Sequence, residues 1–434
     1  MKPLIRSSKG QAIVLVAVTL LVLLGFAGLA VDIGMAYGVQ AKLNAAVDAA
    51  AIAAGRAISR GTEAAKTQAK DYFYANFPTG VLGSTVSAPN TAPQQRRDGS
   101  WDIEVSATAS VPTNFAKLIG WPVLTVRASA TSTVRSLDLV LVLDSSPSLS
   151  HPSETLDQLK IAANDFLSRF DQVNDRIGLV HFSSCAVSDV TITETRGFNL
   201  TAINAAIDGI TLGGSTATVE GLRKAKAQLD NVSAGSRNSL RVIVFFSDGA
   251  PNCVTGVFDG VLGVLSAYNE DPCHNGRAAV MYSIDEPNTR LGNYCSLLTL
   301  PDIGYMGVNL RSDRNPPTRA LETSGGNIVN TICNANRAAR NMAENVAQAA
   351  RGEAESPIHI FTIGLGKFVT TQEMNCGYGS DESGKNILRR LANVQGVDTH
   401  DTSQPTGLYA YAADGTQLDD AFRQVENALL RLTR

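Results

Sequence analysis

From residue 137 onward the chain is predicted to form an α/β fold built on a parallel sheet, on two observations. First, near-continuous apolar runs of strand length recur, at residues 137–143 (LDLVLVL), 176–183 (RIGLVHFS), 240–247 (LRVIVFFS) and 358–366 (IHIFTIGLG). Such runs are typical of strands covered on both faces, as in a parallel sheet. Second, apolar residues at helical spacing lie between these runs, so strands and helices alternate.

The helices follow from these apolar stripes. The first carries its stripe from Leu156 to Phe170, and further helices are predicted at residues 201–210, 219–229, 327–351 and 419–432. Each pattern repeats with the period of an α-helix that buries one face.

Two segments depart from the alternation. Residues 190–194 (VTITE) are predicted to form an edge strand beside residues 176–183. A stretch rich in Gly, Pro, Asn and Asp follows Asp248, and we predict that it forms an insertion at about residues 251–326.

The N-terminal part is predicted to enter a membrane. Residues 12–31 are uncharged and apolar over about the length that spans a bilayer as a helix. Lys2, Arg6 and Lys9 precede this run and Asp32 follows it, so residues 1–10 are expected to stay cytoplasmic and the rest to be exported. No small-x-small cleavage site ends a shorter apolar region, which favours a retained anchor at residues 11–33 over a cleaved signal.

Residues 34–78 are predicted to continue as one long helix, a stalk, because the segment is rich in Ala and other helix formers up to Pro78. Its apolar positions recur at helical spacing and comprise Val39, Leu43, Val47, Ala50 and Ala54. Residues 79–136 alternate polar and apolar side chains, which predicts a small β-rich module packed against the stalk.

Composition excludes some classes of protein. A formal net charge of −3 and an apolar fraction of 44% fit a folded chain. The sequence has no basic stripe with interleaved aromatic residues, which is the pattern of a nucleic-acid-binding protein. The six cysteines show no zinc-type spacing. Their even number in an exported chain favours disulfide bonds.

Polar side chains follow two of the predicted strands and precede one predicted helix. Asp144, Ser146 and Ser148 come directly after the first strand, Thr216 lies in a glycine-led loop, and Asp248 ends the strand at 240–247. Ligands bind at the carboxyl ends of the strands in open α/β sheets, and carboxylate and hydroxyl oxygens suit a hard divalent cation. Helix capping explains each segment taken alone, whereas the three together favour a shared site.

This order, Asp-x-Ser-x-Ser, a Thr loop and a strand-ending Asp-Gly, resembles the metal-ion-dependent adhesion site (MIDAS) of von Willebrand factor A domains. The resemblance implies a Rossmann-like sheet over residues 137–434 and one Mg²⁺ (or Ca²⁺ or Mn²⁺). It assigns the metal to Asp144, Ser146, Ser148, Thr216 and Asp248. Pro147 stands where this family often has Gly, and it should push Ser146 into an extended conformation.

The N-terminal third resembles TadE/TadG-like proteins of tight-adherence (Flp) pilus assembly, through the apolar helix, the LNAAVDAAAIAAGRAI segment and the β-rich segment that ends at Val134. Together with a C-terminal von Willebrand A domain, this is the arrangement of TadG-like proteins. The resemblance implies a single-pass protein of the bacterial inner membrane. Its C-terminal domain would be periplasmic, or at the cell surface or on the pilus.

The cysteines gather near strand ends and in the insertion. Cys185, Cys253 and Cys376 follow predicted strands, whereas Cys273, Cys295 and Cys333 belong to the insertion or the helix after it. Parallel strands end at one edge of the sheet, so we hypothesise that the insertion lies over the metal site and is held there by disulfide bonds. Burial of some cysteines as free thiols is the alternative.

Three classes of function follow. The first is a membrane-anchored pilus assembly or minor pilin-like protein. Its A domain would mediate metal-dependent binding or adhesion to a carboxylate of a protein partner, such as a pilus subunit, an assembly protein or a surface ligand. The alternative is a structural scaffold of the pilus or secretion machinery without a functional metal site. An enzyme is not expected, because the five histidines are scattered and no nucleophile elbow, phosphate loop or HExxH motif occurs.

Overall fold

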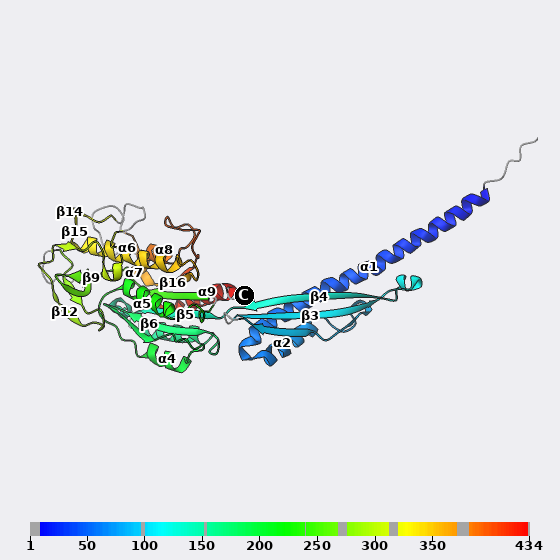
Figure 1. The fold of residues 1–434 in the computed structure, drawn as a ribbon, viewed down its shortest axis with the longest axis horizontal. Helices are drawn as coiled ribbons and strands as arrows, with labels where there is room; N and C mark the ends of the chain where they lie inside the picture. Colours follow the sequence, from blue (N-terminus) through cyan, green and yellow to red (C-terminus); the bar gives the residue numbers. More distant parts are fainter. Residues whose placement is uncertain are drawn as a thin grey trace, which may run out of the picture. The chain divides into compact units, whose positions relative to one another are not determined.

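The structure, a computed structural model, describes residues 9–96, 100–151, 154–238, 240–267, 276–311, 320–370 and 382–432. The chain divides into two compact units, residues 1–134 and 135–434 (Figure 1). Each unit has its own hydrophobic core. Four residues on which predictions depend, Lys2, Arg6, Cys273 and Cys376, lie outside the described residues.

Two helices form one side of the first unit. α1 (Lys9–Ala57) is the only helix in the described ranges that is long and apolar enough to cross a membrane, and its side chains at 13–27 are exposed. It is followed by a 3-10 turn, η1 (Ile58–Arg60), and by α2 (Thr62–Asn76), which packs against α1. The prediction of one helix up to residue 78 is wrong, because Gly61 has φ 103° and ψ 163°, which no α-helix contains.

The other side of the first unit is an antiparallel sheet. β3 (Trp101–Pro112) pairs with β4 (Val123–Val134) on one side and with β1 (Thr85–Val86) and β2 (Asn90–Gln95) on the other. Alternate β3 side chains from Ile103 to Val111 are buried against the apolar stripe of α1 that was predicted from the sequence. Two 3-10 turns, η2 (Val81–Gly83) and η3 (Ala116–Ile119), lie in the connections.

The second unit is built on a six-stranded sheet in the order β17-β16-β8-β5-β6-β7. All neighbours are parallel except β6 and β7, so the predicted parallel sheet is confirmed. Its strands are β5 (Leu137–Asp144), β6 (Arg176–Phe182), β7 (Ala186–Val190), β8 (Leu240–Ser247), β16 (Ile358–Leu365) and β17 (Tyr409–Ala412). The edge strand β7 lies earlier than the predicted residues 190–194, because the chain turns back directly after Ser183 and Ser184.

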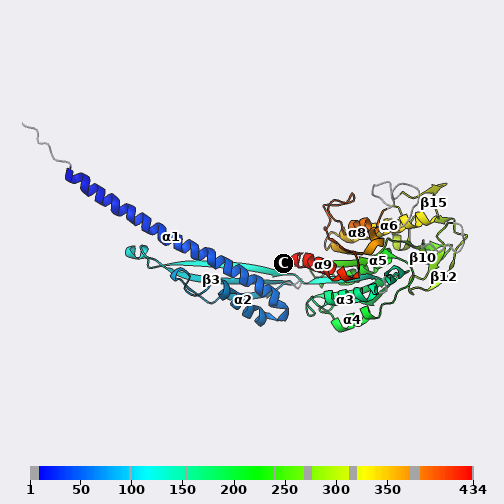
Figure 2. The ribbon, with the colours of Figure 1, turned by 180° about the vertical axis from the view of Figure 1, so that it is seen from behind.

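Helices cover both faces of this sheet (Figure 1; Figure 2). α3 (Thr155–Leu167), α4 (Leu200–Asp208) and α9 (Leu418–Leu432) pack on one face. α5 (Thr218–Asp230), α6 (Ile332–Arg351) and α8 (Gly384–Leu391) pack on the other. The short elements α7 (Gly366–Thr370), η4 (Pro147–Ser150) and η7 (Gly415–Gln417) complete the connections.

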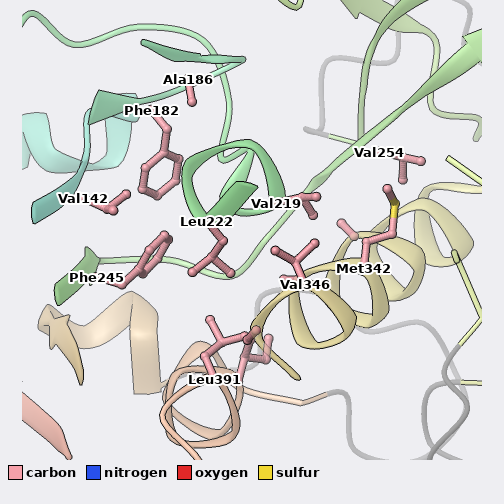
Figure 3. Packing of buried hydrophobic residues seen from close by; sticks show 14 of the residues in the cluster. Val142, Phe182, Ala186, Val219, Leu222, Phe245, Val254, Met342, Val346 and Leu391 are labelled. Carbon is pink, nitrogen blue, oxygen red and sulfur yellow. The ribbon is translucent and has the colours of Figure 1, made fainter. Parts of the chain in front are cut away.

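Alternation along the central strands explains these two cores. Val140 and Val142 of β5 belong to the cluster under α5, whereas Leu139 and Leu141 belong to the cluster under α3 and α9. Figure 3 shows Leu222 of α5 pointing toward Phe245 of β8, and the rings of Phe245 and Phe182 stack with centroids 5.1 Å apart. Burial of the strands on both faces is the physical reason for their near-continuous apolar sequence.

Over its described residues, the insertion forms two small antiparallel sheets. One contains β9 (Cys253–Phe258), β10 (Val261–Ser266), β11 (Val280–Tyr282) and β12 (Arg290–Asn293). The other contains β13 (Thr299–Leu300), β14 (Thr323–Ser324) and β15 (Asn327–Val329), and η5 (Tyr305–Gly307) lies between β13 and β14 in the chain. The helix predicted from residue 327 therefore begins only at Ile332, because residues 327–329 pair as a strand.

The cysteine hypothesis needs a correction. Cys185 and Cys253 are free and buried, so they hold no disulfide bond, and burial raises the pKa of Cys185 to about 11. Cys295 and Cys333 are disulfide-bonded. The disulfide pairing of the cysteines in the insertion stays a prediction. So does the hypothesis that disulfide bonds hold the insertion over the metal site.

Candidate functional site

Two neighbouring strands of the second unit end side by side. β5 and β8 are parallel, and Leu143 pairs with Phe246. Asp144, the last residue of β5, and Asp248, which directly follows β8, therefore leave the sheet at the same carboxyl edge. This placement is the one that the two apolar runs predicted.

Asp144 is held rigidly at this edge. One carboxylate oxygen, Oδ1, accepts the backbone N–H of Ser146 at 2.8 Å, and the other, Oδ2, accepts the hydroxyl of Ser247 at 2.6 Å. Burial raises the pKa of Asp144 to about 6, against the opposing effect of the hydrogen bonds from Ser247 and Ser146. These contacts fix the carboxylate at the centre of the site.

Three oxygen atoms converge beside it. The Ser146 and Ser148 hydroxyl oxygens are 3.0 Å apart, and Ser148 Oγ donates to Asp248 Oδ1 at 2.9 Å. Ser146 Oγ lies 3.5 Å from the same Asp248 oxygen. The structure thus brings Ser146 and Ser148 together with Asp248, which lies about a hundred residues later in the chain.

Pro147 shapes the loop that carries both serines. It is the first residue of the 3-10 turn η4, and Ser146 before it has φ −68° and ψ 157°. This is the extended conformation that the sequence predicted for a residue preceding proline. Proline at this position leaves both hydroxyls directed to one carboxylate, so it is compatible with the site.

The Thr216 loop connects α4 to α5 and is attached to both other loops. The Gly213 N–H donates to the Ser145 carbonyl at 3.0 Å, which fixes the loop beside the Asp144 segment. The Thr216 N–H donates to the Asn252 side-chain oxygen at 2.7 Å, and the Asn252 N–H donates to the Thr216 carbonyl at 3.1 Å. These backbone bonds hold Thr216 next to the segment after Asp248, while the role of its hydroxyl stays a prediction.

Sequence reasoning missed two residues that support the site. Ser247 orients Asp144, and Asn252 joins the Thr216 loop to the chain after β8. Ser247 could have been found as the polar residue that ends an apolar strand next to Asp248. Nothing in the local pattern marked Asn252, because its partner is distant in the chain.

The insertion reaches the same edge. Ser266 of β10 shares a hydrogen bond of 2.7 Å with Ser215, next to Thr216. Asn288 Oδ1 accepts the hydroxyl of Ser183 at 3.0 Å and lies so close to Gly214 that a Cβ atom there would be 2.4 Å away. The insertion therefore packs against the Thr216 side of the site.

The donor set fits a hard cation. Carboxylate and hydroxyl oxygens are the ligands that Mg²⁺ and Ca²⁺ prefer, and the cluster offers both types within hydrogen-bonding distance. Over the described ranges, no three His, Cys, Asp or Glu side chains gather as a metal site of their own. The edge therefore offers two carboxylates, Asp144 and Asp248, together with the hydroxyls of Ser146 and Ser148.

Comparisons with known proteins agree with this architecture. Residues 138–268 match the family model described as von Willebrand factor type A domain, and residues 10–57 match the model described as putative Flp pilus-assembly TadE/G-like. The chain is thus a von Willebrand A domain protein with a TadE/G-like N-terminal segment. This combination confirms the TadG-like assignment that the sequence resemblance indicated.

Several solved structures are similar over part of the fold. They include the PilB minor pilin from Streptococcus sanguinis, with 11% identity, 81% of this chain and 80% of that chain covered, and a TM-score of 0.41. The vWF domain of the type V pili tip protein Mfa5 from Porphyromonas gingivalis has 16% identity, 70% and 98% coverage, and a TM-score of 0.42.

A third similar structure is proximal thread matrix protein 1 from the mussel byssus, with a zinc-occupied MIDAS motif. It has 14% identity, 68% of this chain and 46% of that chain covered, and a TM-score of 0.34. The chain thus spans less than half of that protein. A search of curated proteins finds no match.

Proposed function

We propose that this chain is a membrane-anchored component of a Flp pilus system whose exported A domain binds a protein partner through a divalent cation. The proposed ligands are Asp144, Ser146, Ser148, Thr216 and Asp248. A bound cation supplies a coordination position open to a partner's carboxylate. The residues themselves hold the ion, and Ser247 and Asn252 keep the loops in place.

The observation that carries the proposal is the spacing of three oxygens. Octahedral Mg²⁺ holds its ligands at about 2.0–2.1 Å, which sets neighbouring oxygens roughly 2.9 Å apart. The Ser146–Ser148 and Ser148–Asp248 oxygen pairs are 3.0 and 2.9 Å apart, and the Ser146–Asp248 pair, at 3.5 Å, has to close by about half an ångström. Little rearrangement is therefore needed for an ion to replace the hydroxyl hydrogen bonds.

The test compares two serines of one turn. Ser148→Ala removes a proposed ligand, whereas Ser150→Ala removes a hydroxyl that donates to the Pro147 carbonyl at 2.7 Å. We expect Mg²⁺ or Mn²⁺ to raise the unfolding midpoint of the wild type and of Ser150→Ala by several degrees, but not that of Ser148→Ala. A ligand at a hundred times its Kd stabilises by about 2.7 kcal/mol, which accounts for a shift of this size.

Two results would contradict the proposed metal site. An equal rise of the midpoint in both variants would show that the ion binds elsewhere. No rise in the wild type with Mg²⁺, Mn²⁺ or Ca²⁺ would favour the alternative, a structural scaffold of the pilus or secretion machinery that needs no metal.

The membrane part of the proposal rests on α1. Its apolar segment is exposed over residues 13–27, and it coincides with the TadE/G-like match. We propose a single span at residues 11–33 of the bacterial inner membrane, with residues 1–10 cytoplasmic and the A domain periplasmic or carried on the cell surface or pilus. The proposed partners are pilus subunits, assembly proteins or a surface ligand.

A further inference from the structure

The loop between β3 and β4 lies against α1 at the end of its apolar segment. This hairpin loop, residues 113–122, contains the 3-10 turn η3. Asp32 of α1 accepts three of its backbone N–H groups, from Asn114 at 2.8 Å, Phe115 at 2.9 Å and Ala116 at 2.7 Å. Because Asp32 directly follows the apolar run at 12–31, this carboxylate holds the loop at the end of that run.

Phe115 extends the contact along the helix. A Cβ atom on Gly28 would lie 2.5 Å from the Phe115 ring, so the ring occupies the space that a side chain would need. Gly28 is about one helical turn, roughly 6 Å, before Asp32 and within the apolar run. The hairpin loop therefore reaches back beside the segment that is proposed to lie in the bilayer.

The outer surface of the hairpin loop is apolar. Leu118, Ile119 and Trp121 are 78%, 68% and 65% exposed, and Lys117 beside them is also exposed. An exposed group of large apolar side chains marks a contact surface. Trp at the level of the headgroups, with a basic residue next to it, is the composition of a membrane interface.

Most backbone N–H groups of the loop have an acceptor within the first unit. The N–H groups that donate hydrogen bonds within the first unit belong to Thr113, Asn114, Phe115, Ala116, Leu118, Gly120 and Trp121. The Thr113 hydroxyl also donates to the Trp121 carbonyl at 2.6 Å. Irregular backbone is not tolerated against lipid in the hydrocarbon region, so a loop of this kind suits the headgroup region and not the centre of the bilayer.

We propose that the hairpin loop 113–122 is a second membrane contact, which inserts Leu118, Ile119 and Trp121 into the headgroup region of the leaflet where α1 ends. The inference rests on the proposed membrane span of α1. Two contacts with the bilayer, one helical and one from the sheet, fix how the first unit stands on the membrane. A lipid surface is favoured over a second copy because the loop is continuous with the apolar run through Gly28 and Asp32.

The chain contains two tryptophans, which makes the test specific. Trp101 pairs with Val134 at the opposite end of β3 from Pro112, which adjoins the hairpin loop. The full chain is placed in phosphatidylcholine–phosphatidylglycerol nanodiscs with or without brominated acyl chains. We expect bromine to quench most of the emission of the Trp101→Phe variant, which reports Trp121, and little of the emission of Trp121→Phe, which reports Trp101.

A separate flotation of the chain with vesicles of the same lipids distinguishes the two possible failures. A chain that floats, but whose Trp121 emission is the same with and without bromine, would overturn the hairpin contact and leave the anchor intact. A chain that does not float would overturn the proposed membrane span itself.

Discussion

Asn252 joins two of the three loops that form the candidate site. Its side-chain oxygen accepts the Thr216 N–H, and its own N–H donates to the Thr216 carbonyl. Removing the side chain should loosen the Thr216 loop, since only the backbone bond from the Asn252 N–H would remain between them, without touching a proposed ligand. Groups that orient metal ligands in this manner strengthen binding although they do not touch the ion.

We therefore predict that Asn252→Ala lowers the affinity for Mg²⁺ roughly 10- to 100-fold, measured by titration calorimetry. Asn199→Ala is the matched control, because Asn199 also accepts a backbone N–H, from Ala202 at the start of α4. That variant should lose about 1 kcal/mol of stability and keep its Mg²⁺ affinity. Equal affinity in the two variants would contradict the role given to Asn252.

Asp175 gives the second unit a dependence on pH. Its carboxylate accepts the N–H groups of Leu137 and Asp171, each at 2.9 Å, and burial raises its pKa from 3.8 to about 7. The folded state therefore binds a proton more tightly than the unfolded state does. The free energy of unfolding should fall as pH rises between about 4 and 7.

Asp175→Asn should show a smaller fall over the same pH range, measured by urea unfolding in buffer without divalent ions. Asp144 acts in the same direction, since its pKa is raised to about 6, so the difference between wild type and variant isolates Asp175. Identical pH dependence in the two proteins would rule out the effect.

At this scale the sequence predicted that Asp144 and Asp248 would lie at one edge, because each follows an apolar run of strand length. The extended conformation of Ser146 followed from Pro147. Asn252 and Asn288 were out of reach, because their partners are distant in the chain and no periodicity marks them.

Among the elements, the break between α1 and α2 depends on one residue. Gly61 has φ 103° and ψ 163°, a conformation almost restricted to glycine, and no atom lies within 4 Å of where its Cβ would be. The Ala-rich sequence on both sides favours helix, so composition alone predicted no break. The backbone of Gly61 decides where α2 begins.

We predict that Gly61→Ala lowers the free energy of unfolding of the first unit by about 1–3 kcal/mol, through backbone strain alone. Gly34→Ala is the control, since Gly34 lies within α1 with open space around it and should gain about 0.5–1 kcal/mol. Denaturation of the full chain in detergent measures both changes. A destabilised Gly34→Ala or an unaffected Gly61→Ala would contradict this account of the break.

Long buried elements were predictable because they carry many apolar positions with one period. β5, β8 and β16 are examples, since both of their faces are covered. The insertion was not, because strands such as β13 and β14 are two residues long and hold their places by pairing with β15. Short strands of this kind leave no periodic signal in the sequence.

At the scale of the whole molecule, the membrane-type helix and the candidate site lie in different compact units. The first carries the apolar helix and the TadE/G-like match, and the second carries the von Willebrand A match and the candidate site. The order of these parts was predictable from one apolar run and one alternating pattern. Which cysteines stay free was not predictable, because a free cysteine is commonly buried like a small apolar residue and the sequence does not mark it.

The central claim is that loops from β5, β8 and the α4–α5 connection hold one divalent cation. Anomalous diffraction from crystals soaked in Mn²⁺ tests it most directly. We predict a single strong peak bounded by the hydroxyl oxygens of Ser146 and Ser148 and by the Asp144 and Asp248 carboxylates, with Thr216 facing it. A soaked crystal with an open site and no peak there would contradict the claim.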